Sequence, residues 1–133
     1  MKVVLVNGSR RDAGCTYTAL SVVAKELEAQ GIDTEIVAVG SRVVKGELGG
    51  TTSTVDVLNK YFQINQMPVV SSNYWNIVHG NTPDEVVKDE EGMQTMRLLG
   101  QNFAWLVKSI DAAKKQGIEL PQGENKIKTN YIR

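Results

Sequence analysis

The sequence has one cysteine, one histidine and no long hydrophobic run, and its charges cancel. Cys15 alone cannot form a disulfide within the chain, and a single thiol cannot build a cysteine-only zinc or iron–sulfur site within one chain. Fifteen basic and fifteen acidic side chains give a net charge of zero, so no general field attracts a nucleic acid or an anionic membrane surface. Any ligand must therefore be held by a local arrangement of residues.

The amino-terminal segment also lacks the features of a targeting sequence. One lysine precedes a short apolar run at residues 3–6, and the chain turns polar at Asn7. This run is too short for a secretory signal or a membrane span, and together with the lone cysteine it predicts a cytoplasmic protein. A chain of 133 residues is long enough to bury a core, so we expect a single domain over residues 1–133.

No Ser-His-Asp or metal-ligand spacing is present in the sequence. His79 lies in a polar stretch, which favours a solvated or hydrogen-bonded role over catalysis. Residues 89–91 are expected to form a solvated acidic surface. Tyr74 and Trp75 favour packing or an interface over stacking on a ring, and Trp105 is expected to lie in the core. None of these residues is assigned a catalytic role.

The first forty residues predict a strand, a helix and a second strand. Residues 3–6 form a β-branched and leucine run, typical of a strand buried on both faces. Apolar residues then recur at helical spacing, and Gly31 follows as a stop signal; they are Leu20, Val23, Ala24 and Leu27. Residues 34–39 are β-branched and alternate in polarity. The three elements together predict a right-handed βαβ unit.

The remainder of the chain predicts helices around one more strand. Glycines interrupt residues 40–54, which we expect to form a loop, and residues 55–62 predict a short helix capped by Ser53 or Thr54. Residues 67–71 predict a strand. Thr82 and Pro83 are typical of a helix start, and apolar spacing continues to Lys115, so we expect a long amphipathic helix that covers one face of the sheet.

The loop between the first strand and first helix, residues 8–16, is the strongest candidate site. At the carboxyl edge of a parallel sheet, backbone N–H groups and a helix N-terminus converge, and their partial positive charge can hold a phosphate. Side chains that could add to this site are the hydroxyls of Ser9, Thr16 and Thr18 and the guanidinium of Arg10 or Arg11. The loop matches neither the nucleoside-triphosphate loop nor the Gly-x-Gly-x-x-Gly dinucleotide turn.

A structural role for the same loop stays open when spacing alone is considered. Residues 8–16 could form an ordinary polar connection in which Thr16 or Cys15 lies near the helix cap. Although a thiolate would be favoured at a helix start, Cys15 is more simply explained as a small buried residue of the cap region.

Two stretches of sequence resemble a known family. Residues 7–31, NGSRRDAGCTYTALSVVAKELEAQG, are similar to the amino terminus of the flavodoxin-like NAD(P)H-dependent FMN reductases, a group that includes the iron–sulfur flavoprotein relatives. Residues 49–106, from GGTTSTVDVLNKYF to QNFAWL, resemble the carboxyl-terminal half of the same family. The resemblance implies that the first loop wraps the FMN phosphate and that the Gly-Gly-Thr-Thr stretch lies beside the flavin ring.

The resemblance also implies individual binding residues. It places the phosphate among the side chains of Ser9, Arg11, Thr16, Tyr17 and Thr18 and the backbone donors of Gly14 and Cys15. It places the flavin ring near Gly49, Gly50, Thr51 and Thr52.

The chain departs from the family between the second strand and Gly49. Family members carry there a cysteine-containing segment, a third strand with a Ser-Pro-x-Tyr flavin loop, a helix and a fourth strand. Residues 40–48 replace them, so the chain looks like a family member with an internal deletion of the central segment. The expected fold is a truncated flavodoxin-like α/β three-layer sandwich with a short, mainly parallel sheet of about three strands.

Loss of the middle strands would expose one edge of the first strand and the inward faces of helices. We therefore expect the sheet to be completed by a second chain, in a homodimer or a higher assembly with element exchange, or by insertion of residues 67–71 beside the first strand.

Two functions follow. The first is an FMN-binding oxidoreductase of the NAD(P)H-dependent flavin reductase type, in which the nicotinamide is a transient hydride donor and no acid–base residue is needed. The alternative is a non-catalytic, flavodoxin-derived oligomeric scaffold that has lost productive flavin binding.

Overall fold

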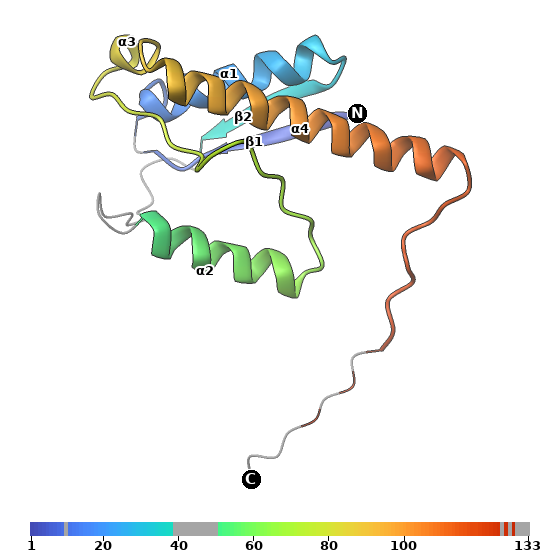
Figure 1. Cartoon of the computed structure of the whole chain (residues 1–133). Helices are drawn as coiled ribbons and strands as arrows, with labels where there is room; N and C mark the ends of the chain where they lie inside the picture. The colour runs from blue at the N-terminus through green and yellow to red at the C-terminus, as the bar shows by residue number, and fades with distance from the viewer. Residues whose placement is uncertain (10, 39–50, 126, 128, 130–133) are drawn as a thin grey trace.

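The amino-terminal βαβ unit is present in the computed structural model, which describes residues 1–9, 11–38, 51–125, 127 and 129. Strand β1, Lys2–Asn7, pairs in parallel with β2, Asp33–Ala38. Helix α1, Cys15–Ala29, connects them (Figure 1). Gly31 follows α1 with a φ of 75°, a conformation that glycine adopts without strain. The strand, helix and strand predicted for this region are confirmed.

The two faces of this sheet differ in how far they are covered. Because side chains alternate along a strand, Val3 and Leu5 point to one face, where they pack against the core that α1 contributes. The opposite face carries Val4, Val6 and Val37, all of which are exposed. Among the residues that the structure describes, helices therefore cover one face of the sheet only, and the prediction that residues 3–6 are buried on both faces is wrong.

The predicted strand at residues 67–71 is wrong. The sheet of the described residues has two strands, and residues 67–71 are extended without ladder hydrogen bonds. The carbonyl oxygen of Ser71 instead accepts a hydrogen bond of 2.8 Å from Nδ2 of Asn102, and Pro68 has no N–H to give to a sheet. The fold is mixed α/β with a short parallel sheet, smaller than the three-stranded sheet expected.

Helix α2, Thr51–Ile64, begins earlier than predicted. The expected loop over residues 40–54 is therefore wrong for residues 51–54, and its other part lies outside the described residues. Ser53 and Thr54, the predicted caps, therefore lie inside the helix. Hydroxyl residues are tolerated within a helical turn as well as at its start. The residues predicted to form one face of this helix, Val55, Leu58 and Phe62, are exposed.

The long helix predicted from Pro83 to Lys115 is divided in two. Helix α3, Pro83–Val86, is capped by Thr82, whose Oγ1 accepts a hydrogen bond from the N–H of Glu85. Helix α4, Glu90–Lys115, has its own cap at Asp89. The second cap marks the break between the two helices.

Helix α4 packs along α1 (Figure 1). Val3 and Leu5 of β1 pack against a core to which both α1 and α4 contribute. The core contains Ala19, Val23, Leu27, Ile32, Val86, Met93, Met96 and Ala104. Trp105, expected in the core, is 70% exposed because it follows the inward-facing Ala104 and lies off the apolar stripe.

No helix among the described residues combines the length and the apolar character that crossing a membrane requires.

Candidate functional site

The candidate loop is held in shape by Asn7, the last residue of β1, which is fully buried. Its Oδ1 accepts a hydrogen bond of 3.0 Å from the N–H of Ser9, and its Nδ2 donates one of 3.2 Å to the carbonyl of Asp12. Asn7 is not among the residues predicted to form the site. The signal was present, since an asparagine before Gly-Ser commonly forms a turn with the backbone two residues ahead.

A second turn follows directly. The Oγ of Ser9 accepts a hydrogen bond of 3.2 Å from the N–H of Arg11, and Arg11 is exposed. Arg10, the other candidate cation, lies outside the described residues. These two turns carry the chain from the end of the sheet to the start of α1 with Ser9 and Arg11 on the same loop.

Helix α1 begins without a side-chain cap. Gly14 is its N-cap, with extended backbone angles, and no side chain accepts a hydrogen bond from the first turn. The first helical hydrogen bond runs from the N–H of Thr18 to the carbonyl of Gly14, at 3.0 Å. The first turn also contains no acidic residue. The partial positive charge of this helix end is therefore not neutralised by α1 itself.

The other predicted residues of this loop are gathered around the same helix end. Thr16 and Tyr17 are exposed. The Oγ1 of Thr18 donates a hydrogen bond of 3.3 Å to the carbonyl of Gly14, so this hydroxyl supports the helix start in the structure. Cys15 is half-buried, and its Sγ donates to the carbonyl of Gly80 at 3.5 Å. Cys15 thereby links the loop to the segment that precedes α3.

That segment is anchored by Asp89, which corrects the prediction of a solvated acidic run for this residue, whereas Glu90 and Glu91 are exposed as predicted. Its Oδ1 accepts a hydrogen bond of 3.0 Å from the N–H of Gly92, and its Oδ2 accepts one of 2.6 Å from the backbone N–H of His79. These two donors, first Gly92 and then His79, hold the pKa of the Asp89 carboxyl below its ordinary value. The side chain of His79 is exposed, in agreement with a solvated role.

We expect the Asp89→Asn variant to be less stable than the native chain at neutral pH, since asparagine has one acceptor oxygen in place of two. A lowered pKa means that this stabilisation is present above the unfolded value of about 3.9 and is lost as the pH falls through the lower folded value. The difference in Tm between the two proteins should therefore shrink below about pH 4.

Thermal unfolding followed by circular dichroism between pH 7 and pH 2.5 would test this expectation. Asp56→Asn, on the exposed helix α2, makes the same change of charge and serves as the control. A Tm difference that does not depend on pH would contradict the assigned role of Asp89.

Two of the four residues predicted to lie beside a flavin ring are part of the described structure. Gly49 and Gly50 lie outside the described residues. Thr51 and Thr52 form the first turn of α2, and their side chains are not described. No hydrogen bond among the described residues joins α2 to the loop of residues 7–14.

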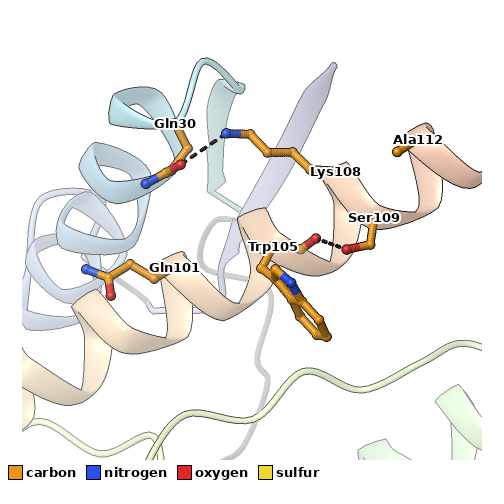
Figure 2. A pocket seen from close by; sticks show the side chains of 6 residues that line it. All are labelled: Gln30, Gln101, Trp105, Lys108, Ser109 and Ala112. Atoms are coloured by element: carbon orange, nitrogen blue, oxygen red, sulfur yellow. Dashed lines mark hydrogen bonds between the residues drawn. The ribbon is translucent and has the colours of Figure 1, made fainter.

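A hollow lies at the carboxyl-terminal end of α1, away from the loop. Figure 2 shows Gln30, Gln101, Trp105, Lys108, Ser109 and Ala112 around it. The Nζ of Lys108 donates a hydrogen bond of 3.0 Å to Oε1 of Gln30. Because α1 has fifteen residues, this hollow is roughly 20 Å along the helix from its N-terminus. It gathers no set of acid, base and nucleophile, and the described residues hold no cluster suited to a metal ion.

One protein family matches the chain. The model of the family described as NADPH-dependent FMN reductase matches residues 1–46, a range that contains β1, the candidate loop, α1 and β2. The match bears out the resemblance that the loop sequence indicated, and it does not extend to residues 49–106. No curated protein and no solved structure matches the chain.

Proposed function

We propose that this chain, whose residues 1–46 match the model of the NADPH-dependent FMN reductase family, is a cytoplasmic FMN-binding oxidoreductase. When bound, the flavin supplies the redox chemistry, with NADPH or NADH as the hydride donor. The residues of the chain bind and orient it. The observation that carries this proposal is the α1 N-terminus, which follows a parallel strand and has neither a side-chain cap nor an acidic first turn.

The phosphate end of FMN fits this helix end. A phosphate accepts hydrogen bonds from backbone N–H groups and is stabilised by the positive end of a helix dipole. The backbone of Gly14 and Cys15 would contribute donors, with Thr16 and Tyr17 exposed beside them. Arg11 would add a positive charge. Ser9 and Thr18, which already hydrogen-bond within the loop, would keep the donors in place.

The ring end rests on the resemblance. We place the flavin ring near Gly49, Gly50, Thr51 and Thr52, on a single domain from which an internal deletion near residues 40–48 has removed the usual ring-binding loop. The exposed outer face of the sheet supports the loss of covering elements. A second copy of the chain, in a homodimer or a higher assembly, would then provide a wall for the ring.

A titration with FMN, followed by quenching of flavin fluorescence, tests the proposal. We expect saturation at one FMN per chain. We expect affinity to fall roughly ten- to a hundredfold in Arg11→Ala, because loss of a charge-assisted hydrogen bond costs about 1.5–3 kcal/mol. Lys60→Ala removes the same kind of charge from the exposed helix α2 and should bind normally. A folded protein that does not bind FMN would instead support the non-catalytic scaffold.

A further inference from the structure

Helix α2 has an apolar half that nothing covers among the described residues. At 100° per residue its apolar side chains occupy one half of the helix circumference, and they are between 37% and 70% exposed. These residues are Val55, Val57, Leu58, Tyr61, Phe62 and Ile64. The opposite half is polar, with Asp56, Asn59, Lys60 and Gln63. This is the pattern of a helix that packs its apolar half on another surface.

The sheet offers a matching surface on its outer face. Val6 and Val37 lie side by side in the parallel register, and Val4 precedes Val6 on the same face. These three valines are 38% to 60% exposed. Towards the start of the strands, Lys2 and Glu35 form an ion pair of 2.6 Å. The outer face is therefore apolar at the carboxyl end of the strands and charged at the other end.

We propose that the apolar half of α2 from one copy packs on the outer face of the β1–β2 sheet of a second copy, reciprocally, about a two-fold axis. Such an interface is self-complementary, since each copy gives one helix and one sheet face. The nine apolar side chains involved offer on the order of 900 Å² per copy, comparable with a standard interface. The chain has no net charge, so two copies do not repel one another.

The connection after α2 ends at a contact with helix α4. Residues 65–71 lead from α2 to Ser71, whose carbonyl is held by Asn102 of α4. Helix α4 packs on α1, on the side of the sheet away from Val4, Val6 and Val37. The link therefore leads from α2 to the covered side of its own sheet. The interface is independent of the flavin, so failure of FMN binding would leave it intact.

Sedimentation equilibrium of the full chain without flavin tests the interface. We expect the native protein to have twice the mass of one chain, and Leu58→Glu to be monomeric, since a buried carboxylate in this interface would be unpaired. Lys60→Glu, on the polar half of α2, should stay dimeric. Circular dichroism would show that both variants retain their helices. A monomeric native protein, or a dimeric Leu58→Glu variant, would overturn the proposal.

Cysteine pairing separates the two-copy arrangement from one in which α2 folds back on its own sheet. In a Cys15→Ser background, chains carrying only Val6→Cys are mixed with chains carrying only Leu58→Cys and oxidised with diamide. A disulfide needs Cα atoms within about 7 Å, so we expect a mixed cross-linked dimer as the main product. If a chain carrying both substitutions instead forms only an internal disulfide when diluted, the proposal is overturned.

Discussion

The Gly100→Val variant is expected to lose about 3 kcal/mol of stability, and with it about 10 °C in Tm. Gly100 is a buried residue of α4 at its contact with α1. A Cβ atom there would lie 2.7 Å from the Cβ of Glu26 and 3.1 Å from the carbonyl oxygen of Val23. Neither atom belongs to the free end of a side chain, so the two helices would have to move apart.

That separation would disturb most of the core, because α1 and α4 contribute most of its buried residues. Thermal and urea unfolding measure the effect. Gly123→Val is the matched control, since a Cβ at Gly123 would meet nothing within 4 Å. If Gly100→Val unfolds at the same temperature as the native chain, the close contact of the two helices is wrong.

The Gly14→Asp variant is expected to keep its stability and to lose FMN binding. Aspartate is among the best N-cap residues, and its carboxylate would accept hydrogen bonds from the first turn of α1, which has no side-chain cap. The same carboxylate would occupy the proposed phosphate position and repel the phosphate. The added Cβ would lie 3.0 Å from the Cβ of Arg11, and this loop residue can shift slightly.

We expect affinity for FMN to fall by at least about a hundredfold while Tm is unchanged or raised, since an N-cap contributes about 1 kcal/mol. Isothermal calorimetry and thermal unfolding measure the two quantities on the same sample. Gly14→Ser adds a neutral cap of similar position and should weaken FMN binding much less. Equal affinities for Gly14→Asp and the native chain would place the phosphate away from α1.

The βαβ unit could be predicted from the sequence because its signals are local. The β-branched run before Asn7, the helical spacing of Val23 and Leu27, and the stop at Gly31 each act within a few residues. The candidate loop is similarly contiguous, so Ser9, Gly14 and Thr16 necessarily lie together once strand and helix are placed. The sequence pattern therefore predicts both the βαβ unit and the grouping of these loop residues.

The elements that differ from prediction depend on partners distant in sequence. Residues 67–71 have a strand-like composition, but a strand forms only beside another strand, and Ser71 is bound to Asn102 of α4 instead. In the sequence, Asp89 is one of three adjacent acidic residues. Only the fold brings the backbone N–H of His79 to the carboxylate of Asp89. Trp105 resembles a core residue by type, but its position on α4 faces away from α1.

The measurement that tests the central claim most directly compares FMN with riboflavin, which has the same ring and no phosphate. If the α1 N-terminus holds the phosphate, FMN should bind at one per chain and riboflavin at least about tenfold more weakly, a difference of about 1.4 kcal/mol. Equal affinities for the two flavins, or binding of neither by the folded protein, would contradict the account.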